Sequence, residues 1–127
     1  MKHTIFVLAM SLLLPATVNA ADIDRKYAVS VANGKMGSCG QYITARDEGR
    51  RSKYRKENRH ISWIFGYLTA YNRQTPDTWS IEGQTDTSAI LLWLENYCKR
   101  NSLAAFAEAM EPLTDELHPK RIRKAPK

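Results

Sequence analysis

The sequence contains few of the residues from which catalytic and metal sites are built. It has only two cysteines and three histidines among 127 residues, and their scattered spacing matches no zinc finger. It contains no Gly-x-Ser-x-Gly, no His-Glu-x-x-His and no glycine-rich phosphate loop. His60 could act as a base, but the sequence places no catalytic partner beside it. We therefore expect no enzymatic activity, no bound metal and no cofactor.

Long apolar runs are also scarce. One apolar run, residues 4–14, follows the basic residue Lys2, and the small residues Val18 and Ala20 come shortly after it. This three-part pattern is typical of a secretory signal peptide that is cleaved after Ala20. The run is shorter than the roughly 20 residues that a membrane-spanning helix needs. We predict that residues 1–20 are removed and that the mature protein is soluble and periplasmic.

Export determines how the two cysteines are interpreted. Cys39 and Cys98 both lie in the predicted mature part of the chain. An even pair of cysteines in an oxidising compartment predicts a disulfide bond. The bond would close a loop of about 60 residues, which corresponds to about 4 kcal/mol of stabilisation in the chain-entropy description.

Hydrophobic periodicity predicts an all-α domain over residues 38–118. The four expected helices cover residues 39–46, 60–74, 87–100 and 103–117. Ser38 and Asp86 stand where N-caps belong, and Pro112 predicts a kink in the last helix. Gly66 would weaken the second helix by about 1 kcal/mol relative to alanine, which indicates close approach of another helix. We expect a partly ordered arm at 21–37 and a basic disordered tail at 119–127.

The formal charge of +6 is unevenly distributed. Residues 46–59 hold seven basic and three acidic residues, whereas residues 75–118 hold two basic and eight acidic ones. The candidate binding residues are Arg46, Arg50, Arg51, Lys53, Arg55, Lys56 and Arg59. This segment, a loop or a solvated helix extension, could dock onto acidic helices of the same chain or a second copy. It could also bind anionic lipid or polysaccharide, or be a solvated face; export argues against nucleic acid.

Three stretches carry a family resemblance. They are SCGQYITARD at 38–47, ISWIFGYLTAYN at 61–72 and WLENYCKRNSLAAFAEAMEPLTDEL at 93–117. The chain resembles the HdeA-like and Rap1a/Tai-like group of small periplasmic proteins. The resemblance implies that Cys39 pairs with Cys98 and that Gly66-Tyr67 packs beneath the bridge. The expected core and motif residues are Ile64, Gly66, Tyr67, Trp93, Tyr97 and Leu103.

The resemblance also implies a binding function without a cofactor. HdeA-like proteins are acid-stress chaperones, and Rap1a/Tai-like proteins are immunity proteins that block a secreted toxic amidase. We predict a non-enzymatic periplasmic protein of the immunity or inhibitor type that docks onto another envelope or secreted protein. An acid-stress chaperone and a binder of anionic envelope surfaces are the alternatives. The sequence leaves the oligomeric state and the identity of the partner open.

Overall fold

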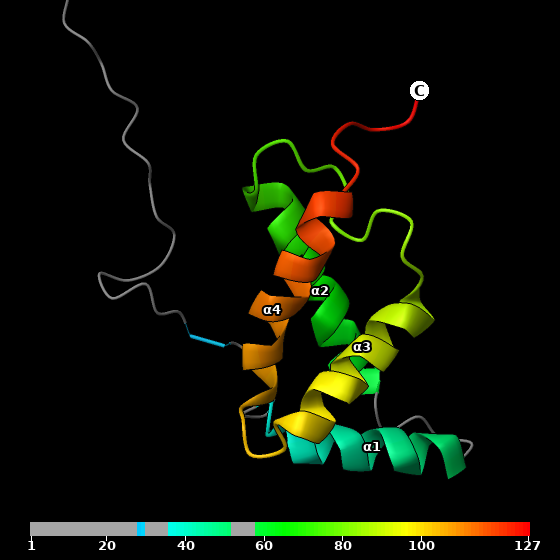
Figure 1. Ribbon diagram of the computed structural model, residues 1–127, viewed down its shortest axis with the longest axis vertical. Helices are drawn as coiled ribbons and strands as arrows, with labels where there is room; N and C mark the ends of the chain where they lie inside the picture. The colour runs from blue at the N-terminus through cyan, green and yellow to red at the C-terminus, as the bar shows by residue number, and fades with distance from the viewer. Residues whose placement is uncertain (1–27, 30–35, 52–57) are drawn as a thin grey trace, which may run out of the picture.

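The computed structural model describes residues 28–29, 36–51 and 58–127, and this part of the chain is helical (Figure 1). Its elements are α1 (Cys39–Arg51), α2 (Asn58–Gln74), α3 (Thr87–Arg100), the 3-10 helix η1 (Phe106–Ala109), α4 (Met110–Leu117) and the 3-10 helix η2 (His118–Lys120). The described residues contain two isolated β-bridges and no strand. The predicted all-α class is confirmed. The predicted signal peptide, residues 1–20, lies outside the described residues.

A disulfide bond joins α1 to α3, as predicted. Cys39 and Cys98 are both fully buried, and their Cα atoms lie 4.7 Å apart. Helix α1 crosses one end of the molecule below α3, while α2 and α4 extend away from it (Figure 1). The largest fully buried side chains are Tyr42, Phe106, Ile64, Leu68, Ile81, Ile90, Leu94, Met110 and Leu113. The bridge therefore lies inside the core, at the junction of the two helices.

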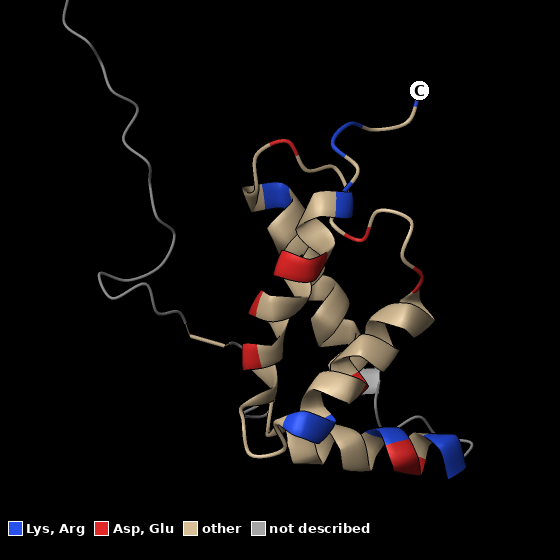
Figure 2. Ribbon diagram, viewed as in Figure 1, with Lys and Arg blue, Asp and Glu red and all other residues tan. Residues whose placement is uncertain are grey.

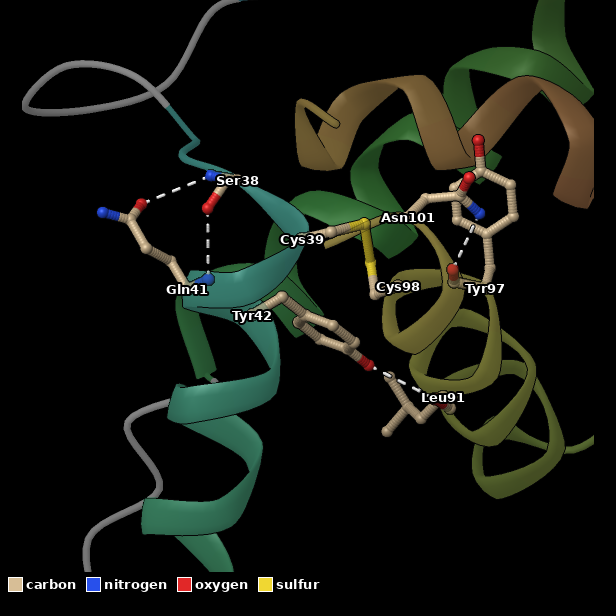
Figure 3. The surroundings of a disulfide bond; sticks show 8 residues. All are labelled: Ser38, Cys39, Gln41, Tyr42, Leu91, Tyr97, Cys98 and Asn101. Atoms are coloured by element: carbon tan, nitrogen blue, oxygen red, sulfur yellow. Dashed lines mark hydrogen bonds between the residues drawn. A yellow bond between two sulfur atoms is a disulfide. The ribbon is translucent and has the colours of Figure 1, made fainter. Parts of the chain in front are cut away.

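The start of α1 has a reciprocal cap (Figure 3). The Gln41 N–H donates to Ser38 Oγ, and the Ser38 N–H donates to Gln41 Oε1, both at 3.3 Å. This is a capping box, which satisfies donors that a helix N-terminus leaves unpaired. The helix continues to Arg51, beyond the predicted end at residue 46. The first part of the basic segment is therefore helical.

Helix α2 begins two residues before its predicted start. Ile64 and Leu68 are fully buried, as the periodicity requires. The expectation for Gly66 is wrong, because this residue is exposed and a Cβ atom there would meet nothing within 4 Å. Among the described helices none comes within contact of a Cβ atom at this position, and nothing in the structure explains the glycine.

Helix α3 has the predicted bounds and the predicted cap. Asp86 Oδ1 accepts a hydrogen bond from the Ala89 N–H at 2.8 Å. Ile90, Leu91 and Leu94 form its buried stripe. A residue with a carboxylate that bonds the first turn is the standard way to begin a helix, and this local signal was sufficient to place the boundary.

The predicted last helix, residues 103–117, is wrong in its first half. Residues 101–105 form a loop, η1 follows, and the α-helix begins only at Met110. Pro112 does not kink the helix, because it lies in the first turn of α4. An N–H at this position has no partner within the helix, so its absence in proline breaks no bond.

The chain just after α4 is folded onto the α2–α3 loop, so the predicted disordered tail does not begin at residue 119. The Ile122 N–H donates to the Ser80 carbonyl at 2.9 Å, and the Ser80 N–H donates back at 3.1 Å. Gly83 has a φ of +60°, and a Cβ atom there would collide with the Lys120 carbonyl oxygen.

Within residues 28–29, 36–51 and 58–127, none of the helices has both the length and the apolar character that a bilayer crossing requires.

Candidate functional site

The basic segment is partly engaged within the molecule. Lys53, Arg55 and Lys56 lie outside the described residues, whereas Arg51 and Arg59 are exposed. Arg46 and Arg50 both reach across to Glu95 on α3. Arg46 Nη2 lies 3.4 Å from Glu95 Oε2, and Arg50 Nη2 bonds the same oxygen. Two of the predicted binding cations therefore hold α1 against α3.

Glu95 is the centre of this cluster, and the sequence interpretation missed it. Its side chain is only 4% exposed, and Lys99 Nζ bonds its other carboxylate oxygen at 2.8 Å. Glu95 lies four residues after Leu91 and three before Cys98, on the buried stripe of α3. A carboxylate at such a position, with a lysine one turn later, is the signal that could have revealed it.

The cluster keeps the Glu95 carboxylate charged. The hydrogen bond from Lys99 lowers the pKa of Glu95 below its ordinary value of 4.5, burial opposes this, and Arg50 adds to the lowering. The bond to Glu95 in turn raises the pKa of Arg50. Arg50 also contacts Asp47 on its own helix, at 3.0 Å. The charges at the α1–α3 junction thus compensate one another.

His60 lies within an aromatic cluster. It is only 3% exposed, and its ring centroid lies 5.2 Å from that of Tyr42 and 5.0 Å from that of Phe106. The Tyr42 hydroxyl donates to the Leu91 carbonyl at 3.3 Å (Figure 3). Among the described residues, no three or more histidine, cysteine, aspartate or glutamate side chains are grouped so that they could hold a metal ion. The surroundings of His60 give it a packing role in the core.

The predicted core and motif residues divide into three groups. Ile64 is in the core, and Tyr67, Trp93 and Tyr97 pack against it while partly buried. The rings of Trp93 and Tyr97 are stacked, with centroids 5.6 Å apart and an interplanar angle of 11°. Gly66 is exposed. The prediction for Leu103 is wrong, because its side chain is 97% exposed.

The start of α1 explains why Leu103 faces solvent. The N–H groups of Cys39 and Gly40 need acceptors outside their own helix. The carbonyls of Ala104 and Ser102 supply them, each at 2.9 Å. Because the carbonyls on both sides of Leu103 are directed at α1, the residue between them is held with its side chain outward. The helical periodicity of the sequence did not include this contact between distant segments.

Leu103 stands at the wall of a groove of about 650 Å³. We call it the α1–η1 groove, and its lining residues are Val29, Met36, Gly37, Ser38, Gln41, Leu103, Ala105 and Ala107. The lining is mostly apolar or small. The Phe106 N–H donates to the carbonyl of one lining residue, Gly37, at 2.9 Å. Gly37 has a φ of +88°, a backbone conformation that residues with a side chain rarely adopt. The groove is suited to bind an apolar side chain.

An acidic edge runs along η1 and α4 (Figure 2). It consists of four exposed residues on η1 and α4: Glu108, Glu111, Asp115 and Glu116. Glu108 directly follows Ala107, which lines the groove. Glu116 Oε1 lies 3.6 Å from Lys120 Nζ. No described cation forms an ion pair with the other three carboxylates. The edge is the opposite of the α1–α3 junction, where charges are compensated.

Comparison with known proteins identifies no relative: no family model, no curated protein and no solved structure matches the chain. The resemblance to HdeA-like and Rap1a/Tai-like proteins therefore stays a prediction.

Proposed function

We propose that this is an exported, non-enzymatic binding protein that docks onto another protein through Leu103 and the α1–η1 groove. The observation that carries the proposal is the 97% exposure of Leu103 on a loop fixed at both ends. A single exposed leucine is ordinary on a protein surface, but an apolar groove beside it makes a binding patch. The buried disulfide supports an oxidising compartment, and we place the protein in the periplasm.

The fixed loop favours binding. The Asn101 N–H lies 3.1 Å from the Tyr97 carbonyl, and the bonds to Cys39 and Gly40 hold the far side of the loop. A surface that is already ordered loses little conformational entropy when a partner binds. Burial of one leucine side chain contributes about 1.5–3 kcal/mol. Leu103 is thus presented to a partner at low entropic cost.

The charges favour a protein partner over an anionic envelope surface. Arg46 and Arg50 are engaged with Glu95, and the groove borders the acidic edge, which repels lipid phosphate and acidic polysaccharide. A partner in the envelope or among secreted proteins fits the immunity or inhibitor role that the sequence resemblance implies. We therefore prefer that role to adsorption on anionic surfaces.

A photo-crosslinking experiment tests the proposal. p-Benzoylphenylalanine is incorporated at position 103 of the full chain in cells of the source organism, and products are identified by mass spectrometry. We expect one protein to be crosslinked in stoichiometric amount. Position 92 is the matched control, because Leu92 is 54% exposed on α3. No product at position 103, or the same products at both positions, would contradict the proposal.

A further inference from the structure

We infer that the segment of the partner that occupies the α1–η1 groove is cationic, with an apolar anchor residue flanked by lysine or arginine. This inference rests on the proposed function and specifies the chemistry of the partner. It follows from two neighbouring features, an apolar groove and an uncompensated acidic edge.

The groove selects the anchor. The small side chains of Ala105 and Ala107 leave room for another side chain, while Val29 and Leu103 supply exposed apolar surface. Glu95 and its cations do not line it. An aliphatic or aromatic side chain loses water when it enters this hollow, whereas a charged side chain would lose hydration and gain no partner there.

The acidic edge selects the flanking charge. Glu108, Glu111 and Asp115 are three and four residues apart, a spacing that places side chains on one face of a helix. Figure 2 shows acidic positions along η1 and α4, on the side from which residues 28–29 lead away. Like charges at this spacing repel one another. Cations from a partner would relieve this repulsion, so the edge favours lysine and arginine beside the anchor.

Other occupants fit these features less well. A second copy also carries exposed cations, such as Arg123 and Lys124, but the apolar residue beside them, Ile122, is bonded to Ser80 within its own chain. An anionic membrane would bring phosphate against the acidic edge. A separate protein with a cationic amphipathic segment satisfies both the groove and the edge.

Designed peptides test the inference with the purified, oxidised mature chain. Three fluorescent 14-residue helical peptides share the same anchor and flanking positions. The first has leucine anchors flanked by lysine, the second has leucine anchors flanked by glutamate, and the third has serine at the anchor positions flanked by lysine. Fluorescence anisotropy at low salt should show the leucine–lysine peptide binding about tenfold more tightly than either of the others. Raising the salt to about 0.5 M should weaken this binding, because exposed charge pairs are screened.

Variants assign the binding to the groove and the edge. Leu103→Ser should weaken binding of the leucine–lysine peptide about tenfold, consistent with the loss of one buried apolar side chain. The triple variant Glu108→Gln, Glu111→Gln, Asp115→Asn should weaken it about five- to tenfold. Asp77→Asn is the matched control, because Asp77 is exposed in the α2–α3 loop and asparagine tolerates its positive φ. This variant should bind like the wild type.

The outcomes separate the inference from the proposed function. Equal, Leu103-dependent binding of the lysine and glutamate peptides would overturn the cationic selection and leave the docking surface intact. Binding that ignores Leu103, the absence of any peptide binding, or Leu103-dependent binding to phosphatidylglycerol vesicles would each overturn the inference. Photo-crosslinking at position 103 tests the docking function independently of these peptides.

Discussion

The α1–α3 junction and the η1–α4 edge treat charge in opposite ways. At the junction, Glu95 is buried beneath Arg46, Arg50 and Lys99, and a disulfide lies a turn away. At the edge, Glu108, Glu111 and Asp115 are exposed and lack described ion-pair partners. The first region uses its charges to join helices, whereas the second leaves its charges exposed close to an apolar groove.

This contrast shows that charge density in the sequence alone does not indicate which charged side chains remain unpaired in the fold. The segment with the most cations in the sequence contributes two of them, Arg46 and Arg50, to ion pairs with Glu95 in its own fold. The surface whose carboxylates lack ion-pair partners lies where the sequence predicted an ordinary amphipathic helix. The two regions differ in whether the chain offers oppositely charged side chains nearby. This difference depends on the packing of α1 beside α3, which the sequence does not show.

Removal of the disulfide should have the largest effect on the junction. The double variant Cys39→Ala, Cys98→Ala should lower the free energy of unfolding by about 4 kcal/mol, because the unfolded chain gains the freedom of a long loop. Urea denaturation followed by circular dichroism measures this change. Wild-type protein in reductant should show a similar loss, and a difference below about 1 kcal/mol would mean that the other α1–α3 contacts suffice.

Neutralisation of one carboxylate should have the next largest effect on the free energy of unfolding, and this effect should differ between the two regions. Glu95→Gln should lower the free energy of unfolding by about 1–3 kcal/mol, because it leaves cations around a neutral amide. Asp115→Asn is the matched control on α4 and should change it by less than about 0.5 kcal/mol. Thermal or urea unfolding of the two variants gives the comparison. Equal effects would show that the junction charges are not coupled to the fold.

Acid should erase the advantage of the junction. Because the pKa of folded Glu95 is lowered from 4.5, its stabilisation is fully present above that value and disappears as the pH falls through the lower folded pKa. The difference in unfolding free energy between the wild type and Glu95→Gln should therefore be constant at neutral pH and shrink below pH 4.5. A difference that persists undiminished to strongly acidic pH would contradict this assignment.

Truncation of Leu103 should have the smallest effect on stability. Leu103→Ala removes a side chain that is 97% exposed, so the free energy of unfolding should change by less than about 0.5 kcal/mol. Leu94→Ala, the same substitution at a fully buried position of α3, should cost about 2–5 kcal/mol. Urea denaturation of both variants checks the contrast. A large loss at position 103 would place Leu103 in the core and remove it from the docking surface.

Local signals in the sequence predicted much of the helical fold. Asp86 placed the start of α3, Ser38 placed the start of α1, and the periodicity of Ile64 and Leu68 identified the core face of α2. These features depend on residues within one or two turns of each other. The cysteine pair was predictable because a chain with only two cysteines has one pairing available.

The candidate site depends on contacts between segments far apart in the sequence. Leu103 is spaced from Phe106 like a helical core residue. The first N–H groups of α1, however, bond the carbonyls on both sides of Leu103, and this holds its side chain outward. Glu95 was overlooked because its cations Arg46 and Arg50 lie on another helix. Periodicity could have placed Glu95 on the buried stripe of α3, but it describes one segment at a time. It could not show that Arg46 and Arg50 approach Glu95 from α1 or that Leu103 faces solvent.

The bonds from Cys39 and Gly40 to the loop after α3 have a consequence for amide exchange. The first amides of a helix usually exchange quickly with solvent deuterium, since nothing within the helix protects them. Here both are bonded to the residues that flank Leu103. Their exchange therefore reports on opening of the Leu103 loop, even though the two amides belong to α1.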